Sequence, residues 1–125
     1  MFGIIKISIR GNFVNQVIEE NMIYEIRGKQ VMLDSDLAKL YQCKNGTKTI
    51  NQAVKRHFDR FPDDFYFQLS INEFKNLKSQ FVTSKGGSRK GHTAFTEQGI
   101  AMLSTILKSK IAIQTSIAIM DAFGK

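Results

Sequence analysis

The spacing of hydrophobic positions changes along this chain, and the change separates predicted strands from predicted helices. Residues 4–10 alternate apolar and polar side chains, and this period of two predicts a strand. Residues 23–33 hold two apolar runs around Gly28, which predicts a β-hairpin whose turn uses the positive φ that glycine tolerates. Residues 11–22 have no clear period, so they are left without a predicted element.

Two helices are predicted next, over residues 35–42 and 48–61, with Gly46 in the turn between them and Pro62 ending the second. Short polar side chains are predicted to cap them: Asp34 or Ser35 the first helix, and Thr47 or Thr49 the second. The apolar side of the second helix is predicted to consist of Ile50, Val54, Phe58 and Phe61.

The rest of the chain alternates short strands with helices. An aromatic strand is predicted at residues 65–69, a third helix opened by a Ser70–Glu73 capping box, and a short strand at 94–95. Thr96 and Ser109 are predicted to cap two closing helices. The last of them, residues 110–123, has apolar side chains on more than one face, which is typical of a buried helix or of a homodimer interface.

These elements predict an α+β fold in one small domain of 125 residues. Residues 1–22 form an N-terminal extension with a strand, and residues 23–125 form the main domain. The chain has one cysteine and no apolar run near the roughly 18 residues that span a bilayer. We therefore expect a cytoplasmic protein with no membrane partner.

Positive charge is concentrated in the middle of the sequence. The net charge is +7, and residues 44–92 hold ten basic and four acidic side chains, whereas residues 1–43 hold five of each. A basic segment between neutral ones indicates a polyanionic partner, although lysines that only keep the surface soluble remain an alternative.

Two short helices joined by a glycine-containing turn have the helix-turn-helix layout, in which the second helix enters the DNA major groove. The predicted base-reading residues on that helix are Lys48, Asn51, Gln52, Lys55 and Arg56. The predicted phosphate contacts are Lys44, Thr47, Arg60, Lys85, Arg89 and Lys90, the last three in a glycine-rich loop that is either a DNA-binding wing or a surface linker. A solvated polar helix face is the alternative for the second helix.

Catalytic chemistry has little support in the sequence. His57, His92 and Cys43 have no metal-ligand spacing, and the loop glycines lack the Gly-Lys-Ser/Thr of a phosphate-binding loop. We expect no enzymatic activity, no metal and no cofactor.

Several sequence blocks in order resemble one protein family. They are residues 23–34, 36–41, 51–56, 60–65, 67–69, 77–80 and 94–103. Together they resemble the N-terminal DNA-binding domain of the ORF-six-N class, a relative of the KilA-N and Bro-N domains of phage antirepressors, over about residues 22–123. The resemblance implies a compact α+β domain of phages and mobile elements that precedes a variable C-terminal region in repressor or antirepressor-like proteins.

The function expected from residues and resemblance together is binding of double-stranded DNA. The alternative is a protein-interaction module that binds a repressor or another protein without contacting DNA. RNA binding is a weaker rival, because the aromatic residues lie at core-like periods and RNA modules favour exposed ones.

Overall fold

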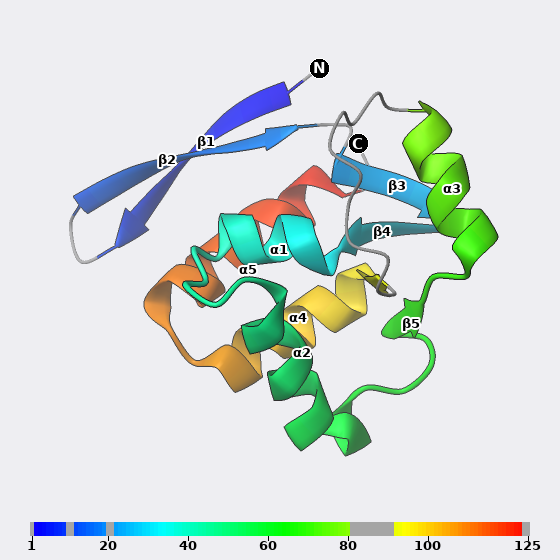
Figure 1. Cartoon of the computed structure of the whole chain (residues 1–125). Helices are drawn as coiled ribbons and strands as arrows, with labels where there is room; N and C mark the ends of the chain where they lie inside the picture. The colour runs from blue at the N-terminus through cyan, green and yellow to red at the C-terminus, as the bar shows by residue number, and fades with distance from the viewer. Residues whose placement is uncertain (1, 10–11, 20–21, 81–91, 124–125) are drawn as a thin grey trace.

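The structure is a computed structural model of the chain, shown in Figure 1. The backbone is described in four stretches: residues 2–9, 12–19, 22–80 and 92–123. Side chains are described for residues 22–77 and 92–123.

A four-stranded antiparallel sheet forms the middle layer. Its strands are β3 (Ile23–Ile26), β4 (Lys29–Leu33), β5 (Tyr66–Gln68) and β6 (Thr93–Phe95), in the spatial order β3-β4-β6-β5. The β3–β4 turn has φ values of 56° at Arg27 and 74° at Gly28. Two consecutive positive φ angles match the right-handed twist of paired strands, and the predicted hairpin is confirmed.

A separate hairpin precedes this sheet. β1 (Phe2–Ile9) pairs antiparallel with β2 (Asn12–Glu19), and β1 lies against the last helix (Figure 1). The strand predicted at residues 4–10 is confirmed over residues 4–9. β2 was not predicted, because its residues have no clear alternation of apolar and polar side chains.

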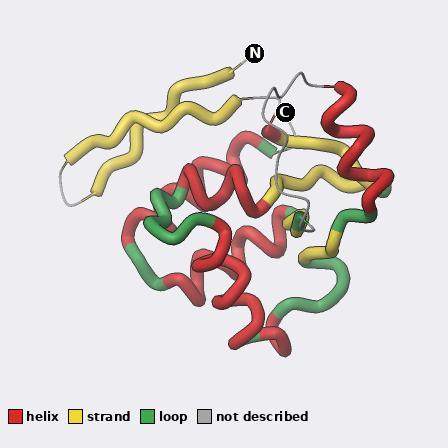
Figure 2. The backbone as a smooth tube through the Cα atoms, in the orientation of Figure 1, coloured by secondary structure: helices red, strands yellow, loops and turns green. Residues whose placement is uncertain are grey.

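Helices cover both faces of the four-stranded sheet (Figure 2). They are α1 (Asp34–Leu40), α2 (Thr47–Arg56), α3 (Ile71–Gln80), α4 (Glu97–Leu107) and α5 (Lys110–Ala122), with a 3-10 turn at Phe58–Arg60. Met32 and Phe95 point to the side of α1, α2, α4 and α5, whereas Val31, Leu33 and Ala94 point to α3. β4 therefore buries three successive residues, because both of its faces are covered. The combination of this sheet with these five helices confirms the predicted α+β class.

Three predicted caps are confirmed. The Ser70 side chain accepts from the Glu73 N–H at 3.1 Å and Glu73 accepts from the Ser70 N–H at 2.8 Å, so the capping box is present. Thr96 caps α4 through the Gly99 N–H at 3.4 Å, and Ser109 caps α5 through the Ala112 N–H at 3.0 Å.

The predicted caps of the first two helices are wrong. α1 begins at Asp34 itself, after Leu33, and α2 begins at Thr47 after Gly46; neither preceding residue gives a side-chain cap. Asp34 does not cap because its carboxylate is buried and accepts a hydrogen bond from α2 instead.

α4 lies unusually close to the segment before β5. A Cβ at Gly99 would overlap the carbonyl oxygen of Phe65. That carbonyl accepts from the backbone N–H of Thr96 at 3.0 Å, and the Thr96 hydroxyl lies 2.9 Å from the carbonyl oxygen of Asp64. The start of α4 is thus fixed against the chain that leads into β5.

Candidate nucleic-acid interface

α1 and α2 are consecutive helices joined by a short ordered turn. Leu37 and Leu40 of α1 belong to the same buried cluster as Ile50 and Val54 of α2. The turn folds back on α1, since the Cys43 N–H donates to the carbonyl of Ala38 at 2.9 Å. Hydrophobic packing and this backbone hydrogen bond together hold α2 at a defined angle to α1.

The outer face of α2 carries positive charge and no acidic residue. Lys48, Gln52, Lys55 and Arg56 are exposed, and their spacing of three or four residues places them on one side of the helix. Lys44 before the helix and Arg60 after it are also exposed, whereas Thr47 is half-buried. We call these four α2 residues the outer face below.

Asn51 is not part of that face. Its side-chain amide donates to Asp34 Oδ2 at 3.0 Å and to the carbonyl of Thr47 at 3.0 Å, and its oxygen accepts from the Thr93 hydroxyl at 3.2 Å. Both amide hydrogens are therefore used inside the protein. In this structure Asn51 connects α2 to α1 and β6, and its assignment to base reading stays a prediction.

The hydrogen bonds around Asn51 extend towards α3. The Gln68 amide donates to the Thr93 hydroxyl at 2.9 Å. His92 places Nδ1 3.8 Å from Asp34 Oδ1 and stacks on Phe74 of α3, with ring centroids 4.3 Å apart. His92 is thus held within the domain, and the outer face of α2 rests on a network that reaches the sheet and α3.

Phe58 is the largest departure from the predicted pattern. The α-helix ends at Arg56, and the chain turns through His57, which has φ −124° and ψ 37°, into the 3-10 turn. Because the periodicity of the α-helix stops there, Phe61 points into the core, 3% exposed, while Phe58 is 72% exposed. The prediction that Phe58 belongs to the core is wrong, and nothing in the local sequence marked this early end of the helix.

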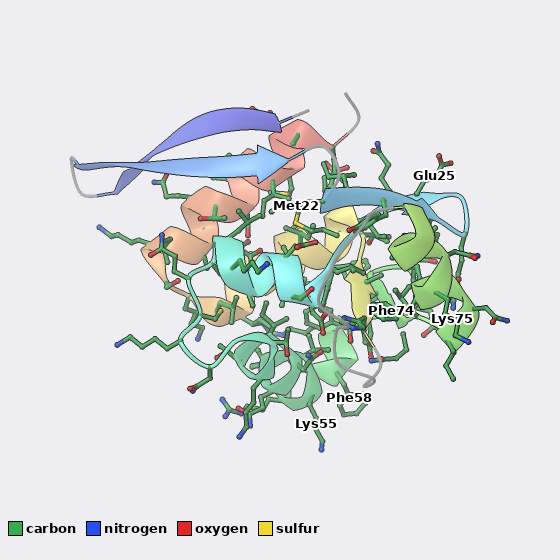
Figure 3. All side chains as sticks on the ribbon, turned by 45° about the horizontal axis from the view of Figure 1, so that its top comes forward. Met22, Glu25, Lys55, Phe58, Phe74 and Lys75 are labelled. Atoms are coloured by element: carbon green, nitrogen blue, oxygen red, sulfur yellow. The ribbon has the colours of Figure 1, made fainter. Side chains whose placement is uncertain are left out.

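Phe58 borders a shallow depression of about 350 Å3 between α2 and the sheet. Lys55 also lines this depression, together with Tyr66 and Gln68 of β5. Figure 3 shows Lys55 and Phe58 near each other below α2, whereas Lys75 lies on α3 at another edge of the molecule.

Lys85, Arg89 and Lys90 lie outside the described residues, so their contact with DNA stays a prediction.

The side chains that could support catalysis or metal binding are buried or lack suitable neighbours in the described part of the chain. Burial raises the pKa of the Cys43 thiol, which opposes formation of a thiolate. Burial also raises the pKa of Tyr41 to about 12, and its hydroxyl lies 2.6 Å from that of Ser116. The described residues contain no group of three or more His, Cys, Asp or Glu side chains that could hold a metal, and no described helix is long and apolar enough to cross a membrane.

Comparison with known proteins gives one match. No curated protein and no solved structure matches the chain significantly. A family model, described as the ORF6N domain, matches residues 21–106, from the start of β3 nearly to the end of α4. This match covers most of the chain. It includes α1, α2 and all four strands of the sheet, and therefore the outer face of α2. The chain therefore belongs to the ORF6N domain family.

Proposed function

We propose that this chain is a double-stranded DNA-binding domain of a phage or mobile-element regulatory protein, of the repressor or antirepressor-like kind, and that it has no enzymatic activity. The observation that carries the proposal is the outer face of α2. It follows α1 through a short turn, it holds three cations and no acidic residue, and it stands exposed on a helix fixed from behind by Asn51. These are the requirements of a recognition helix in a helix-turn-helix domain.

Each exposed group has a role in this proposal. The Gln52 amide suits the N6 and N7 edge of adenine, and Arg56 or Lys55 suits O6 and N7 of guanine. Lys48 lies in the first turn of α2, where base edges are expected. Phosphate contacts are assigned to Lys44, Thr47 and Arg60, and from the glycine-rich segment of the sequence to Lys85, Arg89 and Lys90.

Binding of the 125-residue chain to random duplex DNA across a salt series tests this function. We expect log affinity to fall linearly with log salt, with a slope of about −0.9 for each phosphate contact. Lys55→Gln should weaken binding, whereas Lys75→Gln removes the same charge from exposed α3 and should leave binding unchanged. Absence of binding at low salt, or equal effects of the two variants, would contradict the proposal.

Arg56→Ala and Lys90→Ala separate base reading from phosphate contact. Arg56→Ala should change the preferred DNA sequence, whereas Lys90→Ala should weaken all sequences alike and lower the salt slope. Uniform losses in both variants would contradict the recognition-helix assignment.

A specific observation also favours a protein contact through α5. Lys110, Ile113, Ile117 and Asp121 are exposed and lie at intervals of three or four residues, so they form one stripe along the helix. Ile113 is 43% exposed and Ile117 57% exposed. In an antiparallel pair of α5 helices around a two-fold axis, Lys110 of one copy meets Asp121 of the other and the isoleucines meet in the middle.

We therefore propose a homodimer through residues 110–123, with a repressor protein on the same face as the alternative. Analytical ultracentrifugation should show a concentration-dependent dimer that Ile117→Glu dissociates. Lys110→Asp and Asp121→Lys should each weaken it, and their combination should restore it. A monomer at high micromolar concentration would contradict the homodimer and leave the repressor as the occupant to test.

A further inference from the structure

Four large hydrophobic side chains are exposed in the described part of the chain: Phe58, Ile71, Ile113 and Ile117. Phe58, at 72%, is the one that lies among cations, since Lys55, Arg56 and Arg60 surround it in sequence with Asp59 as the single acid. An aromatic ring exposed to water does not contribute the free energy that burial of its apolar surface would give, so this placement gives the isolated fold no benefit.

The position of Phe58 links it to the outer face of α2. It follows Lys55 by three residues, and the two side chains border the same depression. The neighbouring core does not need it, because Phe61 already fills the aromatic cluster there, with its ring centroid 5.7 Å from Tyr66 and 6.3 Å from Phe95. Phe58 is thus an apolar group attached to the end of a cationic surface.

We propose that Phe58 makes an apolar contact with duplex DNA at the end of α2 and adds affinity that does not depend on charge. Its ring would pack on the apolar parts of the duplex, which are the thymine methyl groups in the major groove and the deoxyribose rings. The cations that flank Phe58 in sequence favour a polyanion over an apolar protein groove, because docking into the groove would strip water from Lys55 and Arg56 without pairing them. This inference rests on the DNA-binding function proposed above.

The contact has a thermodynamic signature that differs from that of the neighbouring cations. Loss of a lysine or arginine contact changes the salt slope, since fewer counterions are released. Loss of the neutral Phe58 ring should lower affinity at every salt concentration and leave the slope unchanged. Because the side chain is mostly exposed, Phe58→Ala should unfold at nearly the same temperature as wild type.

The experiment compares the wild-type chain, Phe58→Ala and Ile71→Ala on two duplexes, alternating dA·dT and alternating dA·dU, across a salt series. Ile71 is the matched control: it is 76% exposed and apolar, and it opens α3 rather than following α2. We expect Phe58→Ala to bind dA·dT about tenfold more weakly with the same salt slope, and Ile71→Ala to bind as wild type. Thermal unfolding of each variant checks that the fold is kept.

The two duplexes distinguish the sources of the contact. If the wild type loses affinity on dA·dU and Phe58→Ala does not, the ring packs on the thymine methyl groups. If Phe58→Ala is weakened equally on both, the ring packs on deoxyribose. Wild-type affinity of Phe58→Ala on both duplexes would overturn the inference while leaving the proposed function intact, whereas a wild-type chain that binds neither duplex at low salt would overturn the function itself.

Discussion

Asn51 and Gln52 are adjacent amides on α2 with opposite surroundings. Asn51 is half-buried and hydrogen-bonded to Asp34, Thr47 and Thr93, whereas Gln52 is exposed. A rotation of one residue along a helix, about 100°, separates the two side chains. The same functional group therefore fixes the helix in one case and is available to a ligand in the other.

This difference divides α2 into two surfaces that can be tested separately. The inner surface should control the free energy of unfolding and, through it, the angle at which the helix is presented. The outer face should control binding to DNA and leave stability unchanged. The predictions below ask whether that division holds.

The largest effect is expected from the apolar part of the inner surface. Ile50 is fully buried in the core cluster that also holds residues of α1 and α4, so Ile50→Ala should lower the free energy of unfolding by about 2–5 kcal/mol through lost burial and a cavity. Urea denaturation followed by circular dichroism measures this. A loss below that of Asn51→Ala would mean that hydrogen bonds, not packing, hold the inner surface.

The next effect is expected at Asn51. Asn51→Ala removes a donor from the buried Asp34 carboxylate, and stability should fall by roughly 1–3 kcal/mol. Gln52→Ala, the matched control, should unfold as wild type. Equal stability of the two variants would show that the inner hydrogen bonds are not formed in solution.

Gln52 should show the reverse behaviour in binding. Gln52→Ala should reduce discrimination for adenine at one position of a selected site by roughly 1–3 kcal/mol, because the bidentate amide contact is lost. Competition binding with single-base variants of that site measures the change. A uniform weakening across all variants would mean that Gln52 contacts the backbone of DNA instead.

The smallest effect on stability is expected from a surface ion pair outside α2. This pair serves as a reference for the inner surface and the outer face of that helix. Arg27 donates to both Glu73 oxygens, at 2.8 and 2.9 Å, and these hydrogen bonds lower the Glu73 pKa to about 2 from an ordinary 4.5. A lowered pKa stabilises the folded state above pH 4.5, and this contribution disappears as the pH falls through about 2.

Acid unfolding of Glu73→Gln measures that contribution. The variant should lose stability relative to wild type at neutral pH, and the difference should shrink as the pH falls through this range. Glu25→Gln, an exposed control on β3, should follow the wild-type curve. A difference that stays constant with pH would contradict the ionic origin of the effect.

Local chemistry explains which parts of the fold were predictable. The Gly28 turn and the Ser70, Thr96 and Ser109 caps depend on residues within four positions of each other, and all were correctly predicted. The α+β class and the order of helices and strands from β3 onward were also predictable, because hydrophobic periods are set by residues close together in sequence.

The parts that were missed depend on residues far apart in sequence. The direction of Asn51 is decided by Asp34, 17 positions away, and by Thr93, 42 positions away. The helical period alone leaves Asn51 at the edge of the apolar stripe. Phe58 has the spacing of a core residue. It is exposed because the α-helix ends at Arg56 and His57 leaves helical geometry, which no pattern in the sequence predicted.

The close approach between α4 and Phe65 has a consequence for laboratory evolution of this domain. At position 99 a single methyl group would occupy the space of a backbone oxygen, and backbone cannot rotate away as a side chain can. In a saturation library selected for folded protein, glycine alone should survive there, while the exposed neighbour Gln98 should accept most of the twenty residues. The contrast between the two positions would report, without any structure determination, how tightly the start of α4 is held in living cells.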